Sequence, residues 1–197
     1  MNKRLGRKFF LRPAVIVAKD LIGKFLVRQF PSQNLSGMIV ETEAYLGVYD
    51  RASHAYGGKV TPRNASEYLE GGHVYIYLCY GMYWQLNITV LEEGVPECVL
   101  IRALEPVVEA KEKSTKQLRK LASGPGRLCR WMKLNRSFDR EDIITSKKLW
   151  IEDRGVKIDS SKIIATKRIG IDYAGNWAKK PLRFLLSQNP FVSVPAK

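Results

Sequence analysis

The sequence predicts an α+β fold: a curved, mainly antiparallel β-sheet with surrounding helices. Segments with strand-like residue patterns recur along the 197 residues, and they do not alternate with helices as regular βαβ units would. No internal repeat, low-complexity tract or long linker interrupts them, which indicates one folding unit over residues 1–197. Hydrophobic residues make up 45% of the chain, enough for a globular core.

The N-terminal half predicts one short helix followed by strands. Apolar residues at helical spacing from Ala14 to Leu21, with Gly23 directly after them, predict the helix. Segments rich in β-branched and aromatic residues and bounded by turn residues predict the strands. These strands are expected at 24–30, at 38–46, at 73–90 as one or two strands around Gly81, and at 98–104.

The C-terminal half predicts two helices and then further strands. The highly charged residues 106–122 predict a helix, and Ser123-Gly124-Pro125-Gly126 separates it from a second helix that runs to Lys133. Short apolar segments predict strands at 148–151, 163–171 and 182–187.

The charge of the chain favours a polyanionic partner. Lysine and arginine total 33 against 19 acidic residues, a net charge of +14. An anionic membrane surface is the alternative, but no amphipathic apolar face accompanies the charge, and no apolar run approaches 20 residues. We therefore expect a nucleic-acid partner and a cytoplasmic, nucleoid-associated protein. Basic residues gather in one stretch: Lys111, Lys113, Lys116, Arg119, Lys120, Arg127, Arg130, Lys133, Arg136 and Arg140.

Histidine and cysteine are too sparse to predict a metal centre or a disulfide framework. The chain has two histidines and three cysteines, and no cysteines form a C-x-x-C pair. Neither a P-loop nor a G-x-G-x-x-G motif is present. We expect no metal and no cofactor.

Two acids and a tyrosine share one side of a predicted strand. Side chains alternate along a strand, so Glu41, Glu43 and Tyr45 would face the same way. Such a set suits a cleft, although a solvent-exposed sheet face would also accommodate carboxylates. The segment alone leaves both interpretations open.

The aromatic segment from Tyr75 to Trp84 contains a second candidate feature. Single residues in it, such as Tyr75, are most simply half-buried packing residues of a strand. Tyr80-Gly81-Met82 differs, because a ring and a thioether beside a glycine predict a protruding turn that could wedge between bases.

Six motifs in order resemble those of the alkyladenine (3-methyladenine) DNA glycosylases of the mammalian type, at the length of a bacterial member. They cover nearly the whole chain and are VETEAYLG at 40–47, DRASHAYGGKVTPRN at 50–64, YIYLCYGMYWQLN at 75–87, VLIRALEP at 99–106, SGPGRLC at 123–129 and IGIDYAGNWAKKPLRF at 169–184.

The resemblance implies a monofunctional enzyme of base-excision repair. It would flip alkylated purines such as 3-methyladenine and 7-methylguanine out of duplex DNA and hydrolyse the N-glycosidic bond, leaving an abasic site. Whether neutral lesions such as hypoxanthine or ethenoadenine are also released stays open. The expected partner is double-stranded DNA containing damaged purines, and the expected state is a monomer. A non-enzymatic nucleic-acid-binding protein is the alternative that charge and aromatic content alone would allow.

The resemblance also implies roles for individual residues. Glu43 matches the general base that activates water, and Arg102 and the main-chain carbonyl of Ile169 would help to hold that water. The remaining positions fall into three groups: Tyr45, His54, Tyr77 and Asn87 in the base pocket, Tyr80 and Met82 in intercalation, and Lys59, Thr61 and Arg127 at the DNA backbone.

The chemistry of the residues agrees with these roles. A single carboxylate can deprotonate water and stabilise an oxocarbenium-like sugar, and an arginine near Glu43 would stabilise its charged form. Purines alkylated at ring nitrogens carry positive charge, which aromatic rings attract by cation–π interaction. His54 could protonate a leaving base or simply hydrogen-bond it, and the sequence leaves both roles open.

Overall fold

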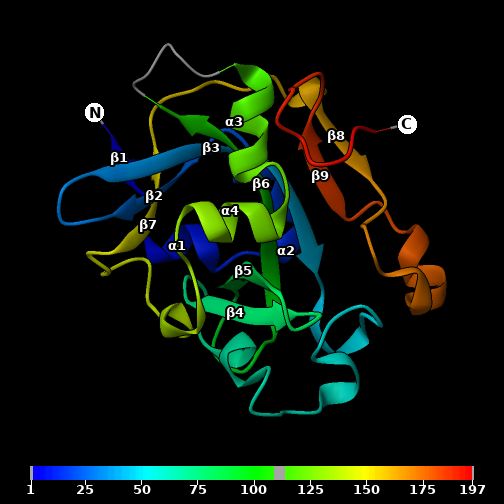
Figure 1. The fold of residues 1–197 in the computed structure, drawn as a ribbon. Coiled ribbons are helices and arrows are strands. Elements are labelled where there is room, and N and C mark those ends of the chain that lie inside the picture. The colour runs from blue at the N-terminus through cyan, green and yellow to red at the C-terminus, as the bar shows by residue number, and fades with distance from the viewer. Residues whose placement is uncertain (1, 109–113, 197) are drawn as a thin grey trace.

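A single twisted sheet organises the computed structural model, which describes residues 2–108 and 114–196 (Figure 1). Nine strands in these residues join it in the order β1-β7-β2-β3-β6-β5-β4, with β9 beside β3 and β8 beside β9, and the pairs are antiparallel. The strands are β1 Lys3–Arg4, β2 Phe25–Gln29, β3 Asn34–Tyr45, β4 Val74–Cys79, β5 Tyr83–Val90, β6 Glu97–Val107, β7 Leu149–Asp153, β8 Ile163–Thr166 and β9 Arg183–Leu186.

The long strand β3 is the centre of this sheet. It pairs with β6 along one edge, and β2 and then β9 share its other edge. The β3–β6 register shifts twice, between Ile39 and Glu41 and between Glu41 and Thr42, so that Val40 and Arg102 have no paired residue opposite. Such bulges change the direction in which a side chain points. This one lies where the acidic residues of β3 stand.

Helices pack against the middle strands. They are α1 Arg7–Phe10, α2 Ala14–Asp20, α3 Thr115–Ala122 and α4 Pro125–Trp131, with short 3-10 segments at η1 Gly47–Tyr49, η2 Tyr56–Gly58, η3 Ala65–Tyr68, η4 Arg136–Phe138, η5 Ser160–Lys162 and η6 Asp172–Lys179. Helix α3 begins with a capping box, because the Ser114 side chain accepts from Gln117 N–H and Gln117 Oε1 accepts from Ser114 N–H. Within the described ranges, no helix is both long and apolar enough to cross a membrane.

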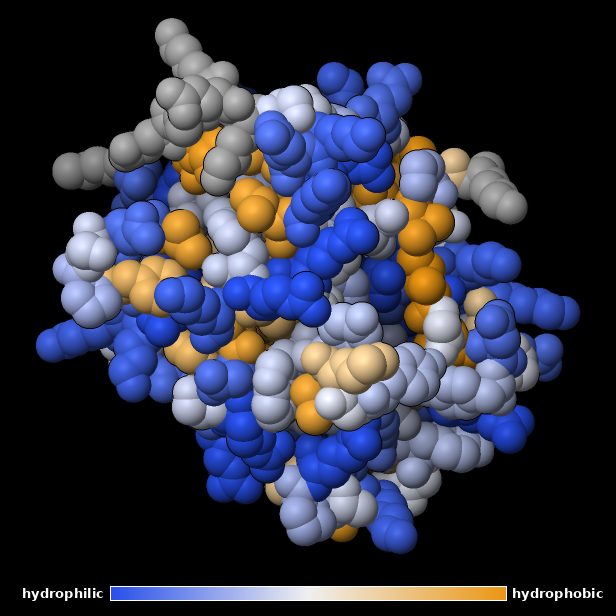
Figure 2. Space-filling model, in the orientation of Figure 1, coloured by the Kyte–Doolittle hydropathy of each residue, from blue (hydrophilic) through white to orange (hydrophobic). Residues whose placement is uncertain are grey.

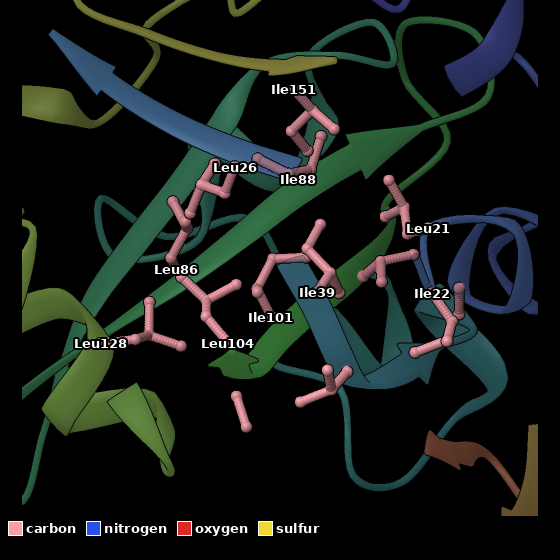
Figure 3. Close-up of a cluster of buried hydrophobic side chains, with 14 of the residues drawn as sticks. Leu21, Ile22, Leu26, Ile39, Leu86, Ile88, Ile101, Leu104, Leu128 and Ile151 are labelled. Carbon is pink, nitrogen blue, oxygen red and sulfur yellow. The ribbon is translucent and has the colours of Figure 1, made fainter. Parts of the chain in front are cut away.

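The hydrophobic core fills the space between the central strands and the helices. Figure 3 shows Leu21 and Ile22, directly after α2, at one end of a cluster and Leu128 of α4 at the other. Between them lie fully buried aliphatic side chains from the strands, including Ile39, Leu86 and Ile101. The rigid sheet that results holds the polar residues of β3 and β6 in fixed positions.

The predicted α+β class with a mainly antiparallel sheet is confirmed. The helix after Ala14 and the strands of the N-terminal half are present, and 73–90 forms two strands, β4 and β5, around the turn at Gly81. The predicted helix over 106–122 is wrong at its start, because β6 continues through Val107 and α3 begins only at Thr115. The positions 109–113 between them lie outside the described residues.

The predicted strand over 163–171 is also too long. Strand β8 ends at Thr166, because its partner β9 ends its pairing at Arg183. The next residues leave the sheet and turn toward β3, where Ile169 contacts Glu43.

Truncation of a core side chain on β6 tests the contribution of this packing. Ile101→Ala should lower the free energy of unfolding by about 2 to 5 kcal/mol, because it leaves a cavity among fully buried neighbours. Urea denaturation followed by circular dichroism measures the change. Ile16→Ala on α2, where the side chain is 44% exposed, serves as the control and should change the free energy far less. Equal losses in both variants would contradict this placement of the core.

Candidate active site

A cavity of about 460 Å³ opens between β3, the β4–β5 hairpin and the segment after β8. Its volume falls within the range of small-ligand sites and suits one flat aromatic ring. Several tyrosines and a histidine line it together with few charged groups. The lining includes Tyr45, His54, Arg63, Glu67, Tyr75, Tyr77, Tyr80, Asn87, Cys98, Arg102, Ile169 and Tyr173.

A buried ion-pair network lies at the inner side of this cavity. Arg102 of β6 contacts both acids of β3, with Nε 3.0 Å from Glu41 Oε1 and Nη1 3.3 Å from Glu43 Oε1. Both carboxylates are fully buried, so the exposed-face interpretation of this strand is wrong. Burial lowers the pKa of Arg102, but the charges of Glu43 and Glu41 outweigh it and raise that pKa overall.

Glu41 accepts four hydrogen bonds, one of them from Arg102. Its Oε1 accepts from Arg183 at 3.0 Å and from the Ser193 hydroxyl at 2.9 Å, and its Oε2 accepts from the Ser193 N–H at 2.7 Å. It does not line the cavity. Glu41 therefore fixes Arg102 in place, and its further partners Arg183 and Ser193 also lie outside the cavity wall.

Glu43 is held by three residues that do line the cavity. Its Oε1 accepts the Ile169 N–H at 2.9 Å and faces Arg102, and its Oε2 accepts the Tyr45 hydroxyl at 3.0 Å. Glu43 itself is fully buried directly behind them. The resemblance implies a role for the Ile169 carbonyl, whereas the Ile169 N–H is the group that contacts Glu43 here.

A second buried ion pair positions the segment that carries Ile169. The Arg168 guanidinium contacts both oxygens of Asp50, at 2.5 and 2.8 Å, and donates to the Ala44 carbonyl at 2.9 Å. It also lies 4.6 Å from the centre of the Tyr45 ring. Arg168 thus joins the segment after β8 to the end of β3 and holds Tyr45 beside Glu43.

Aromatic rings form the wall of the cavity. The His54 and Tyr77 rings meet edge-on with centroids 4.5 Å apart, and His54 Nδ1 lies 2.5 Å from the Tyr75 hydroxyl. Burial within the protein, together with the charge of Arg63, lowers the pKa of His54 to about 4. The imidazole is consequently neutral at pH 7.

The end of the cavity presents hydrogen-bond acceptors. Asn87 Nδ2 donates to the carbonyls of Tyr75 and Gln85, at 3.1 and 3.3 Å, so its Oδ1 turns the other way, toward Cys98. Beside Cys98 lies the Glu67 carboxyl, which is 1% exposed and accepts from Ser53 and Cys98. Burial raises the pKa of Glu67 to about 7.

The tip of the β4–β5 hairpin stands at the mouth of the cavity. Tyr80 has φ +51° and Gly81 has φ +68°, and the Met82 N–H donates to the Cys79 carbonyl at 3.1 Å. Positive φ at both central residues is typical of a tight hairpin turn. The turn projects Tyr80, which is 83% exposed and lines the cavity, and Met82, which is 66% exposed.

Basic and polar residues lie close in the chain to residues that line the cavity. Lys59 is exposed after η2, and the Thr61 hydroxyl donates to Asn64 Oδ1 at 2.9 Å, two residues before the cavity-lining Arg63. Arg127 is exposed on α4, two residues after the cavity-lining Pro125. Figure 2 shows hydrophilic residues over α3 and α4. Of the basic stretch predicted from sequence, Lys111 and Lys113 lie outside the described residues.

The structure brings most of the predicted site residues together. Tyr45, His54, Tyr77, Tyr80, Asn87, Arg102 and Ile169 line one cavity. The sequence interpretation missed Tyr75, whose hydroxyl contacts His54, and it also missed Glu67 and the Arg168–Asp50 pair. Tyr75 stood in the singled-out aromatic segment, but no local pattern marked Glu67 or Arg168.

A cavity of this shape, walled by aromatic rings and backed by a buried carboxylate on a basic molecule, defines the class of enzymes that act on nucleobases. The sequence profile of the methylpurine-DNA glycosylase family matches residues 8–190. The human DNA-3-methyladenine glycosylase is 42% identical over 97% of this chain and 68% of its own length. A Desulfitobacterium hafniense relative, whose name also contains 3-methyladenine DNA glycosylase, is 43% identical over 98% of this chain and 99% of its own length.

The chain belongs to the methylpurine-DNA glycosylase family. It is accordingly a monofunctional DNA glycosylase of base-excision repair, which hydrolyses N-glycosyl bonds of alkylated bases. The alternative of a non-enzymatic nucleic-acid-binding protein is thereby excluded.

The buried Glu67 predicts a pH dependence of stability. Its pKa is about 7 in the folded protein and near 4.5 in the unfolded chain, so the folded state binds the extra proton between these values. The stability that Glu67 contributes is therefore fully present below about pH 4.5 and is lost as the pH rises through 7, by about 3 kcal/mol at most. Glu67→Gln should remove this fall.

Urea denaturation at pH 5 and pH 8 measures the effect. The free energy of unfolding of Glu67→Gln should exceed that of the wild type more at pH 8 than at pH 5. Glu93→Gln at an exposed position is the matched control. A pH-independent difference between Glu67→Gln and the wild type would show that Glu67 is not buried in this way.

Proposed function

We propose that the enzyme flips an alkylated purine out of duplex DNA into this cavity and hydrolyses its N-glycosidic bond with a water activated by Glu43. The observation that carries the proposal is the position of Glu43: its three contacts, Tyr45, Arg102 and Ile169, all line a cavity of base size. The proposed partner is double-stranded DNA with a damaged purine. The enzyme would act as a monomer through one glycosylase unit over residues 1–197, in the cytoplasm near the nucleoid.

The two oxygens of Glu43 are not equivalent. Oε1 already accepts the Ile169 N–H and faces Arg102, while the only partner of Oε2 in the described part of the chain is the Tyr45 hydroxyl. A carboxylate oxygen can accept two hydrogen bonds. Oε2 is thus the oxygen proposed to take a proton from water.

In the proposed reaction, each proton and each electron pair that moves has a named donor and acceptor. Water gives a proton to Glu43 Oε2, and its oxygen forms a bond to the sugar C1′ as the C1′–N bond breaks. The electron pair of that bond moves to the purine. A cationic purine becomes neutral on leaving, so it needs no proton from the enzyme. Arg102 and the Ile169 N–H orient Glu43, and the Ile169 carbonyl is proposed to hold the water.

The pocket residues are proposed to hold the base by stacking and by charge. Tyr45, Tyr77 and His54 offer aromatic surfaces, which attract a cationic ring. Because the pKa of His54 is about 4, the neutral ring is suited to hydrogen bonding rather than to protonating a leaving base at pH 7. Asn87 is proposed to disfavour normal guanine by a clash with the exocyclic amine of that base. 7-Methylguanine carries the same amine, so its acceptance is proposed to depend on its positive charge. Release of hypoxanthine or ethenoadenine would then depend on departure without help from a general acid.

The hairpin tip is proposed to replace the flipped base in the duplex. Tyr80 is 83% exposed and held in a rare backbone conformation by the turn, and Met82 lies exposed beside it. Lys59, Thr61 and Arg127, which lie within two to four residues of cavity-lining residues in the chain, are proposed to contact the DNA backbone.

Substitution of the proposed base tests the mechanism directly. Glu43→Gln should lower the rate of 7-methylguanine release from a duplex by at least about 100-fold, because an amide cannot accept the proton of water. Single-turnover assays of released base measure it, with Glu93→Gln as the control. Full activity of Glu43→Gln, or a covalent protein–DNA adduct trapped by borohydride in the wild type, would overturn the water mechanism.

Substitution at the hairpin tip tests the wedge. Tyr80→Ala should weaken binding to lesion-containing duplex by about 1 to 3 kcal/mol, the energy of one aromatic stacking contact, and should leave the thermal stability unchanged. Fluorescence anisotropy with labelled duplex measures the affinity. Tyr49→Ala, which removes a ring that is 80% exposed and does not line the cavity, is the matched control. If Tyr80→Ala binds the lesion-containing duplex with normal affinity, Tyr80 does not insert into the duplex in place of the flipped base.

A further inference from the structure

Glu67 is an acid of the cavity that the proposed mechanism does not use. It lies on η3, is 1% exposed and lines the cavity. Its Oε1 accepts from the Ser53 hydroxyl at 3.1 Å and from the Cys98 thiol at 3.4 Å. Its Oε2 is buried and has no hydrogen-bond partner among the described residues. A buried carboxyl oxygen without a partner is costly, and a ligand group in the cavity would supply one.

The neighbours of Glu67 connect it to the residues proposed to hold the base. Cys98 Sγ lies between Glu67 and Asn87, 3.9 Å from Asn87 Oδ1. Ser53 stands in the chain between Ala52 and His54, both of which line the cavity. Glu67 therefore lies at the end of the cavity where the edge of a bound base would come to rest.

We propose that Glu67 is a specificity-determining residue that favours positively charged purines over neutral ones. The proposal rests on the function proposed above and adds to it the property of the lesion that the pocket selects. A carboxylate at this end of a largely enclosed cavity attracts a cationic ring, and it offers nothing comparable to a neutral ring of the same shape.

The other groups at this end of the cavity support the same preference. Asn87 Nδ2 donates to two backbone carbonyls, so the amide presents an oxygen rather than an N–H to the cavity. Together with Glu67, it makes the end of the cavity rich in acceptors. Arg63 also lines the cavity, but it is exposed, lies over the Tyr77 ring 5.3 Å from its centre, and is not among the groups that shift the pKa of Glu67.

Glu67 gives the preference a defined pH dependence. Because burial places the pKa of Glu67 at about 7, its carboxyl is largely neutral at pH 5.5 and largely charged at pH 8.5. The other titratable or charged groups that face Glu67 are Tyr68 of η3, Tyr75 of β4, Cys98 of β6 and Asp50 after β3. Burial raises the pKa values of Tyr68, Tyr75 and Cys98, so these three groups stay neutral in this range, and Asp50 is paired with Arg168.

The experiment compares a cationic and a neutral lesion. Duplexes with a single 3-methyladenine, 7-methylguanine or hypoxanthine are given to the wild type, to Glu67→Gln and to the control Glu93→Gln, at pH 5.5 and pH 8.5. 3-Methyladenine is the cationic lesion of the comparison, because it has no ring N–H to lose and keeps its charge at both pH values. Affinity is measured by anisotropy for all duplexes and kcat/KM by base release, so that the affinity for hypoxanthine can be compared even if this base is released slowly. Glutamine keeps the shape and one acceptor oxygen for Ser53 and Cys98, removes the charge and puts an NH2 donor in place of the other oxygen.

At pH 8.5, Glu67→Gln should lose about tenfold in affinity and kcat/KM for 3-methyladenine, the factor that corresponds to one pKa unit of interaction between base and carboxylate. At pH 5.5 the wild type and Glu67→Gln should agree, and hypoxanthine binding should change little at either pH. A residue with a merely structural role would affect both lesions alike.

Two results would count against these conclusions in different ways. If the wild type releases 3-methyladenine and Glu67→Gln keeps its preference over hypoxanthine, the role of Glu67 is wrong and the proposed function stands. If the wild type does not release 3-methyladenine at either pH, the proposed function fails, and the role of Glu67 fails with it.

Discussion

The contact of Arg102 with two fully buried carboxylates is the interaction on which the rest of the site depends. Removing three charges from water is expensive, and it is tolerated only where each charge has close partners and further hydrogen bonds. Glu41 meets this condition through Arg183 and Ser193, and Glu43 meets it through Tyr45 and Ile169. Satisfying the two acids thus fixes the position of every strand and segment that supplies a partner.

The bulge between β3 and β6 makes this contact geometrically possible. A regular ladder would set each residue of β6 opposite one of β3, whereas the register shifts leave Arg102 unpaired, where its guanidinium reaches both Glu41 and Glu43. Glu41 then makes structural contacts alone, outside the cavity wall. Glu43 keeps one oxygen, Oε2, whose single partner among the described residues is the Tyr45 hydroxyl at the cavity wall.

The sequence predicted those features that depend on local pattern. Strand alternation was enough to place Glu41, Glu43 and Tyr45 together, and Gly81 marked the hairpin whose tip carries Tyr80. The bulge, the Arg168–Asp50 pair and the position of Glu67 depend on which distant segments pack together, and no residue spacing encodes that. Charge alone suggested a helix from Pro106, but pairing of Pro106 with Gly37 extends β6 instead. The resemblance supplied the site residues, and the contacts in the structure supply the physical reasons for their positions.

The order of these residues along the chain has a consequence for synthesis. Glu41 and Glu43 leave the ribosome early, whereas Ile169, Arg183 and Ser193 follow about 125 to 150 residues later, which at roughly 5 to 20 residues per second is a delay of many seconds. During that interval the two acids have no complete set of partners and must stay hydrated. The cavity therefore cannot close around Glu43 until residue 169 has emerged, so a shorter nascent chain carries no working glycosylase site.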